Sequence, residues 1–495
     1  MFVSLYIWFS FILCENETTE AERLWEPALT CMIVCLFPSV MSVCLVAARQ
    51  KRNVICNHNL FQNRTSNQHS TMKRRWTKQT VTSDSPISFL LHTHDGLIPF
   101  MTPTLVEKYF PAPQKHLVLG IAVRDTCVVP LYPGNGTKDL SLTKKKKNRK
   151  KVQDKNKPCG FGFSSEKRVQ SFLRAYHRVT VPSFDVVQDA ISAKQTKQQL
   201  IATDNHVMLW TPHGRHALTN ADYLKTNEGL ESGSLVSLYD VAQDGENQKR
   251  RLAARRRTTH WLQETIKGEG NQVWAPLVLT GFPPSPSDKG AADNLGEVVA
   301  KSDRVRGFAI SGYAQLKDEQ VRNKRVNERL QELGCSQKEL LVLSTSSTRQ
   351  LIDCIREGVD IVGSNLPFEW AKAQKAFCVG PTGWQQGGSR KKPHLSEPTT
   401  KTPRLDSDGC LDMSDSCWES DTSPLLDGCS SLACQHHTRA YIHHLVKAKE
   451  LLAQIVLMAH NLHQVLQLCE EATKAKQEGK LDEFCQFIEE QLAAP

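Results

Sequence analysis

The chain has 495 residues, of which 40% are hydrophobic and 23% charged, an ordinary composition for a globular protein. Its length predicts two to four domains or one large α/β barrel with additions. The net charge of +10 suits a polyanionic partner without identifying one. The 16 cysteines are irregularly spaced, which excludes a small secreted disulfide scaffold and favours a reduced, intracellular protein with a local metal site.

The first 80 residues form a distinct N-terminal extension. Residues 28–48 are almost uncharged and long enough to cross a bilayer, which takes ~20 residues. Arg49, Lys51 and Arg52 follow, as at the end of a membrane span. Two interpretations stay open: a membrane anchor, or a non-native extension of the reading frame. The second is favoured because nothing after Thr82 has a secreted or membrane-bound pattern.

Residues 86–379 alternate between short apolar runs and helix-like stretches. Such runs predict buried parallel strands, and eight of them predict a (β/α)₈ TIM barrel, with an open doubly wound sheet as the alternative. Two intervening helices are the clearest, at residues 320–333 and at 349–358, where Gly358 is the expected stop. The eight expected strands cover residues 87–91, 117–123, 207–210, 235–239, 273–279, 307–310, 340–344 and 361–362.

Two insertions interrupt this pattern. Residues 140–157 contain KKKKNRKK and predict a solvated basic loop. Residues 380–427 are acidic and rich in Ser, Thr, Pro and Gly, so we expect a flexible insert that buries too little apolar surface to fold. A third basic cluster, at residues 250–257, fits the solvated face of an amphipathic helix.

Residues 428–495 predict a zinc-binding helical region, to which the family resemblance described below adds a role in dimerisation. Cys429 and Cys434 lie in a short loop, and a long helix follows that carries His460. Two thiolates and one imidazole from a loop and a helix can surround a tetrahedral zinc ion. We therefore expect a clip that ties this helix to the body of the protein.

The phrases HTRAYIHHL, ELLA and MAHN resemble the queuine tRNA-ribosyltransferase (tRNA-guanine transglycosylase) family, and within it the accessory subunit. Members bind zinc through Cys-x-Cys-x-x-Cys, followed by 25 residues and then a His. By this resemblance Cys429, Cys434 and His460 fall on three ligand positions, while Ser431 replaces the second cysteine. The fourth ligand would then be Cys410, Cys417, His436, His437 or water. The alternative is that zinc has been lost.

A second stretch of the same family, RQLIDCIREGVDIVGSNLPFEWAKAQKAF, bears on catalysis. In catalytic members an Asp here attacks the ribose, since a carboxylate must hold the covalent glycosyl intermediate. The matching residue is Gly363, which has no side chain, and Phe368 and Glu369 replace a Thr-Arg pair. The family's other catalytic Asp is also missing, because Asp125 stands in a different context. The resemblance therefore implies a non-catalytic chain with no catalytic or cofactor-binding residues.

What the resemblance implies is an accessory subunit in a heterodimer with the catalytic subunit. That dimer exchanges guanine for queuine at the wobble position of tRNAs with GUN anticodons, and residues 441–463 would form its interface. The expected location is the cytoplasm, with peripheral association at the mitochondrial outer membrane. Two alternatives remain: an active transglycosylase, and a membrane-anchored scaffold unrelated to tRNA that would depend on residues 28–48.

Overall fold

The computed structural model describes residues 71–74, 79–82, 85–94, 96–110, 115–123, 176–182, 202–211, 214–268, 270–281, 294–333, 338–381, 384 and 405–493. The extension up to residue 70, the basic loop at 140–157 and Asp125 lie outside these ranges. None of the helices formed by the described residues is long and apolar enough to cross a membrane.

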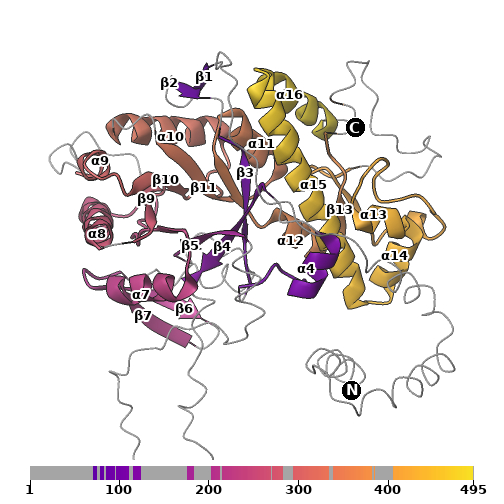
Figure 1. Cartoon of the computed structure of the whole chain (residues 1–495), viewed down its shortest axis with the longest axis horizontal. Coiled ribbons are helices and arrows are strands. Elements are labelled where there is room, and N and C mark those ends of the chain that lie inside the picture. Colours follow the sequence, from indigo (N-terminus) through magenta and orange to yellow (C-terminus); the bar gives the residue numbers. More distant parts are fainter. Residues whose placement is uncertain are drawn as a thin grey trace, which may run out of the picture. The chain divides into compact units, whose positions relative to one another are not determined.

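Eight parallel strands close into a barrel in which neighbours in the sheet are neighbours in the sequence (Figure 1). Helices follow the last five strands in turn, which confirms the predicted TIM barrel. The strands are β3 (Ser88–His92), β4 (Leu117–Ala122), β5 (His177–Val181), β8 (Ser234–Val236), β9 (Gln272–Val278), β10 (Val305–Ser311), β11 (Glu339–Thr345) and β12 (Ile361–Ser364). The helices are α4 (Pro103–Tyr109), α7 (Asn220–Leu230), α8 (Gln248–Lys267), α9 (Leu295–Ala300), α10 (Glu319–Leu333), α11 (Thr348–Arg356) and α12 (Leu366–Lys372).

One of the eight expected strands was wrong. Residues 207–210 belong to β6 (His206–Thr211), which pairs with β7 (Gly214–Thr219) in a separate antiparallel hairpin. The missing barrel strand is β5, whose sequence HRVTV contains no continuous apolar run. Its buried Thr180 instead bonds within the protein, to Asn227 Oδ1 at 2.7 Å and to Ser232 Oγ at 2.8 Å. Hydrophobicity alone could not reveal this strand, because its buried Thr180 hydroxyl is stabilised by hydrogen bonds rather than by apolar contacts.

The barrel interior is a packed apolar core. Side chains from all eight strands or the loops that follow them fill it, as in other barrels of this size. Its members are Leu90, Val118, Ala122, Val179, Val181, Val236, Tyr239, Trp274, Ala309, Leu341, Leu343 and Ile361.

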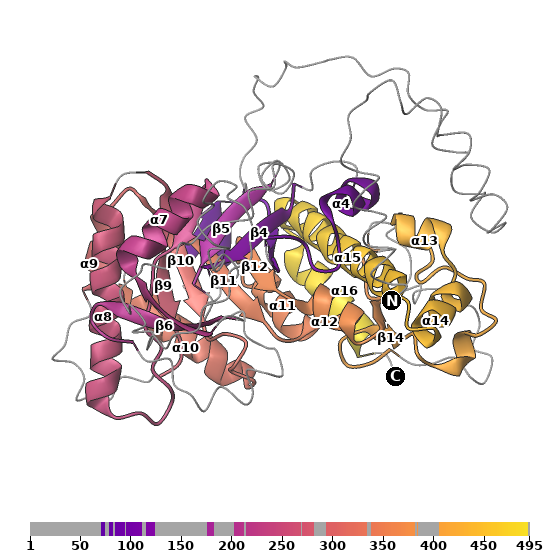
Figure 2. The same cartoon turned by 90° about the horizontal axis from the view of Figure 1, so that it is seen from below.

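The C-terminal region packs against one side of the barrel, and Figures 1 and 2 both show it opposite α8 and α9. It contains β13 (Lys375–Phe377), β14 (Cys410–Asp412), the 3₁₀ turn η5 (Ser416–Trp418), α13 (Leu432–His436), α14 (Arg439–Lys447), α15 (Leu451–Gln477) and α16 (Leu481–Leu492). Side chains of α15 reach the start of β3: Thr473 Oγ1 accepts from Ile87 N at 3.0 Å, and Lys476 Nζ donates to Ser85 O at 2.9 Å. These contacts join the region to the barrel.

Two expectations for this region need correction. The flexible insert predicted over residues 380–427 is wrong for residues 405–427, because β14 pairs with β13 and Trp418 is buried. The single long helix expected after Cys434 is divided into two helices, α14 and α15. The break between α14 and α15 falls at Lys449, whose φ of 57° no α-helix accommodates.

Candidate functional site

Three buried side chains from α13, the loop before it and α15 converge in the C-terminal region. Cys434 Sγ lies 3.3 Å from His460 Nδ1, and Cys429 Sγ lies 3.9 Å from the same nitrogen. Among the described residues, this is the group of Cys, His and acidic residues whose ligand atoms all lie within 4.8 Å of one another. The structure therefore brings together all three residues that the sequence singled out.

Local structure explains how these side chains are placed. Ser431 caps α13, its hydroxyl accepting from the backbone N–H of Cys434 at 3.3 Å, so the two cysteines flank the start of this short helix. The neighbouring Asn461 ties α15 to β13, accepting from Phe377 N at 2.8 Å and donating to Lys375 O at 3.0 Å. The motif MAHN thus serves in two ways: His460 faces the cysteines and Asn461 fixes the helix.

The outer nitrogen of His460 is also held. His460 Nε2 lies 2.9 Å from Phe377 O, which leaves Nδ1 facing the two sulfurs. A metal-binding histidine commonly anchors its second nitrogen on a carbonyl in this way. Tetrahedral zinc, with Zn–S near 2.3 Å and Zn–N near 2.1 Å, places the two donor atoms roughly 3.6 Å apart. The two observed S–N distances, 3.3 and 3.9 Å, lie on either side of that value, so the three residues fit a zinc ion.

The acid–base properties of the cluster favour a thiolate. A hydrogen bond from Cys429 lowers the pKa of Cys434 to about 7, although burial opposes this. The same bond and burial raise the pKa of Cys429 to about 12. For His460, burial lowers the pKa, but hydrogen bonds with Cys378 and Cys429 outweigh it and raise the pKa to about 9. Metal binding here would release protons, as it does wherever protonated donors are displaced.

The expected sources of a fourth ligand are not in this group. Cys410, Cys417, His436 and His437 are all described, and none belongs to the group of three. Two buried residues that the sequence did not single out lie close by. Cys378 Sγ contacts Ala376 O at 3.4 Å and Leu425 O at 3.5 Å, and Gln464 Nε2 lies 2.9 Å from Cys429 Sγ. No motif marks either residue, although Gln464 follows His460 by one helical turn.

The position that the sequence resemblance aligned with the family's nucleophile is closed. Gly363 lies in β12, and a Cβ built on it would lie 2.4 Å from Leu343 O and 2.6 Å from Val342 O. Phe368, which replaces a polar residue of the catalytic pattern, packs against His94 and Phe100 with ring centroids 4.5 and 5.2 Å apart. This end of β12 therefore holds packed aromatic rings and a glycine whose Cβ position is occupied by backbone carbonyls.

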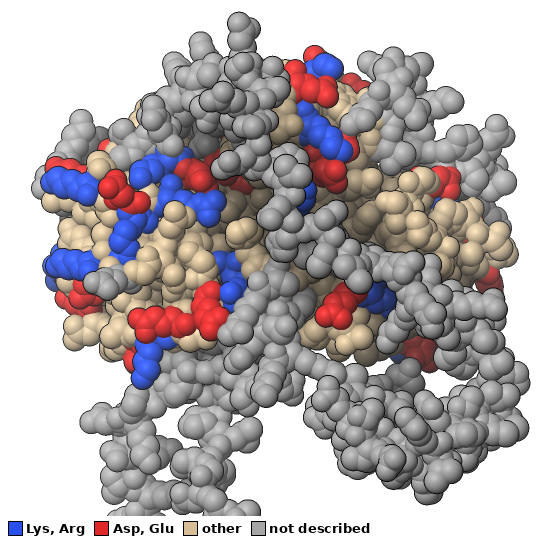
Figure 3. All heavy atoms as spheres, in the orientation of Figure 1, with Lys and Arg blue, Asp and Glu red and all other residues tan. Residues whose placement is uncertain are grey.

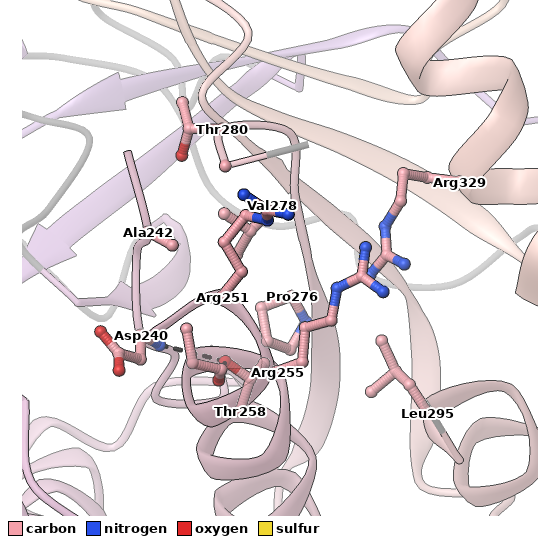
Figure 4. A pocket seen from close by; sticks show the side chains of 12 residues that line it. Asp240, Ala242, Arg251, Arg255, Thr258, Pro276, Val278, Thr280, Leu295 and Arg329 are labelled. Atoms are coloured by element: carbon pink, nitrogen blue, oxygen red, sulfur yellow. Dashed lines mark hydrogen bonds between the residues drawn. The ribbon is translucent and has the colours of Figure 1, made fainter. Parts of the chain in front are cut away.

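The arginines of α8 have two roles. Arg250 and Arg257 bind the buried Asp240 at 2.6 and 3.0 Å, so the expectation of a wholly solvated basic face is wrong for these two. Arg256 is 71% exposed in its side chain and fits that expectation. Arg251 and Arg255 line a pocket together with Arg329 of α10. Figure 4 shows the Arg251 guanidinium beside Val278 and the Arg255 guanidinium beside that of Arg329.

Comparison with known proteins identifies the fold family. The family model for queuine tRNA-ribosyltransferase matches residues 170–494. The chain belongs to this family. Within the queuine tRNA-ribosyltransferase family, it is similar to proteins named queuine tRNA-ribosyltransferase accessory subunit 2. It is 26% identical over 303 residues to that of Danio rerio, 28% over 296 to that of Drosophila virilis and 24% over 317 to that of Homo sapiens.

These matches cover part of each chain. They span 57% of this chain for Danio rerio and Drosophila virilis and 59% for Homo sapiens. They cover 71%, 65% and 74% of those relatives, respectively. Both the matched family region and the relatives' names agree with the resemblance seen in the C-terminal motifs.

Proposed function

We propose that this chain is the non-catalytic accessory subunit of a heterodimeric queuine tRNA-ribosyltransferase. The complex would exchange guanine for queuine at the wobble position of tRNAs with GUN anticodons. The observation that carries the proposal is Gly363, because the matching position has neither a nucleophile nor space for one. The names of the relatives in Danio rerio and Homo sapiens support the accessory role.

The proposed partner surface includes α14 and the start of α15, within residues 441–463. Tyr441 and Leu451 are 42% and 58% exposed, and the described residues hold one other large hydrophobic side chain as accessible, Val321. The face over α13 and α14 is mostly uncharged in Figure 3. Large apolar side chains left exposed on a protein surface commonly contribute to an interface, so this surface suits the catalytic subunit.

The proposed tRNA contact lies elsewhere on the barrel. Figure 3 shows basic side chains gathered, among acidic ones, over α8, α9 and α10. A broad groove beside α8 is lined by Lys249, Arg255, Arg256 and His260. Phosphate contacts from Lys and Arg position a protein on nucleic acid without reading its sequence. This surface could hold the body of the tRNA while the partner carries out the chemistry.

We further propose that Cys429, Cys434 and His460 bind zinc, one ion per subunit. The ion would act structurally, linking α13 to α15 next to the partner surface. Metal analysis of freshly purified chain tests this, and we expect stoichiometric zinc. The division into an extension (1–80), a barrel (86–379), an insert (380–427) and a zinc-binding region (428–495) is part of the same proposal, with residues 405–427 assigned to the folded part.

The deciding experiment is co-purification with the catalytic subunit, followed by exchange of labelled guanine into tRNA. An accessory subunit gives exchange in the mixture and none alone. Exchange by this chain alone would support an active transglycosylase instead. Cytoplasmic location with peripheral attachment to the mitochondrial outer membrane stays a prediction, and carbonate extraction of membranes separates it from an integral scaffold.

A further inference from the structure

The cluster supplies three metal donors where a closed structural zinc site uses four. Ser431 takes the place of the missing cysteine, and its hydroxyl already makes other hydrogen bonds. Its hydroxyl caps α13 by accepting from Cys434 N at 3.3 Å, and it lies 3.1 Å from Cys429 Sγ. A neutral hydroxyl with a capping role is a poor substitute for a thiolate. A fourth donor must therefore come from another side chain or from solvent.

Gln464 is placed to provide it. Gln464 lies four residues after His460 on α15, so both side chains project from the same face of the helix. Its side chain is fully buried, with Nε2 2.9 Å from Cys429 Sγ. Its carbonyl oxygen Oε1 is buried without a hydrogen-bond partner. Buried polar atoms in native proteins are normally satisfied. This amide contacts Cys429 Sγ and leaves one of its two polar atoms unpaired, so it lacks a partner that a bound ion would supply.

The surroundings of Gln464 preserve room for its amide. A Cβ on Gly380 would approach Gln464 Oε1 to 2.8 Å, so a larger residue there would crowd it. The oxygen and nitrogen of a glutamine amide are nearly the same size, and half a turn about the last bond of the side chain exchanges them. In that orientation the oxygen takes the place beside Cys429 Sγ where the nitrogen now lies.

We propose that the Gln464 amide oxygen is the fourth zinc ligand of this chain, replacing the thiolate lost at Ser431. The inference rests on the zinc site proposed above and adds its fourth member. Charge permits it, because two thiolates already balance Zn²⁺ and no further anionic ligand is required. A neutral amide thus completes a neutral site, which costs less to bury than a charged one.

Zinc affinity of the full chain, measured by competition with a chromophoric chelator, tests the proposal together with the absorption spectrum of the Co²⁺-loaded chain. Gln464→Leu should weaken zinc binding at least about tenfold and alter the Co²⁺ spectrum. Gln464→Glu should bind at least as tightly as the unchanged chain, since it keeps an oxygen in place. Gln467→Leu is the matched control: Gln467 lies on the same helix with a buried, unpartnered Oε1, and its loss should leave zinc affinity unchanged.

Restoring the cysteine gives the sharper test. In Ser431→Cys the thiolate should complete the site, so adding Gln464→Leu should cost little affinity. Equal affinities and spectra for the unchanged chain and Gln464→Leu would overturn the inference, as would an equal loss with and without Ser431→Cys. If neither the unchanged chain nor Ser431→Cys binds zinc, the proposed zinc site itself fails. Circular dichroism of each variant distinguishes loss of a ligand from loss of fold.

Discussion

At the scale of single residues, Gly363 separates this chain from the catalytic pattern of its family. By the sequence resemblance it stands where catalytic members have their nucleophile, and the carbonyls of Val342 and Leu343 occupy the space where a Cβ would lie. The hydroxyl of the neighbouring Ser364 already has a hydrogen-bond partner, since it donates to Thr345 O at 3.2 Å inside the barrel. Reversing one substitution would therefore not rebuild a catalytic site.

Gly363→Asp tests this closure. We expect no guanine exchange by the variant alone and a loss of about 1–3 kcal/mol in the free energy of unfolding, because the new side chain overpacks the barrel. Urea unfolding measures the loss. Gly233→Asp is the matched control, since nothing lies within 4 Å of a Cβ at that glycine. Exchange activity in Gly363→Asp would show that the position is open after all.

The sequence predicted the convergence of three side chains better than their surroundings. Cys429, Cys434 and His460 stand at a spacing that a local pattern can reveal, and the structure places their donor atoms together. Gln464 and Cys378 carry no such signal. Cys378 is 51 residues before Cys429 in the chain and reaches the cluster only because β13 leads it past Phe377 to His460.

At the scale of elements, the segment from β14 to α13 folds although its composition is polar. A few buried anchors suffice: Trp418 Nε1 donates to Asp412 O at 2.8 Å, and the Arg439 guanidinium lies 5.1 Å from the Trp418 ring centre. Arg439 in turn binds Asp421 at 3.0 Å. Average composition hid these anchors because they are spread among exposed Ser and Asp residues.

Trp418→Ala should remove the main anchor of this segment. We expect a loss of about 3–5 kcal/mol in the free energy of unfolding, the usual result of truncating a buried tryptophan. Urea unfolding gives the loss, and limited proteolysis should show faster cleavage within residues 405–427. Glu419→Ala, at the exposed neighbouring position, should change neither. If Trp418→Ala resisted urea and protease as well as the unchanged chain does, other contacts would hold the segment in place.

The helices α14 and α15 provide the second element-scale prediction. A double variant Tyr441→Asp/Leu451→Asp should weaken binding to the catalytic subunit by at least about 2 kcal/mol, because it introduces charge into an apolar contact. Isothermal titration calorimetry measures the dissociation constant. Val321→Asp, which changes a comparably exposed side chain on α10, should bind normally. Equal affinities for the two variants would place the interface elsewhere.

At the scale of the whole molecule, the predicted barrel is correct although its strand list contained an error. The prediction missed strand β5 and counted a run in β6 as a barrel strand. These two errors cancelled, so the predicted number of barrel strands was still eight. The fold class survived because seven of the strands are apolar runs followed or preceded by helical patterns. Strand order needed no further information, since neighbours in sequence are neighbours in the barrel.

Metal removal should act on the whole molecule through the junction of α13 and α15. Incubation with a strong chelator is expected to lower the melting temperature by several degrees, since an ion that binds only the folded chain stabilises it. Differential scanning calorimetry measures the shift, and added zinc, but not magnesium, should reverse it. Cys434→Ser should show no response to the chelator. If the chelator lowered the melting temperature of that variant by the same amount, the stabilising metal would not be bound by Cys429, Cys434 and His460.

The central claim is that this chain assists a transglycosylase without being one. The most direct test is incorporation of labelled guanine into a GUN-anticodon tRNA by this chain, by the catalytic subunit and by the co-purified pair. The account predicts a stable complex, no incorporation by this chain alone, and incorporation by the pair well above that of the catalytic subunit alone. Incorporation by this chain alone, or no complex and no stimulation, would contradict it.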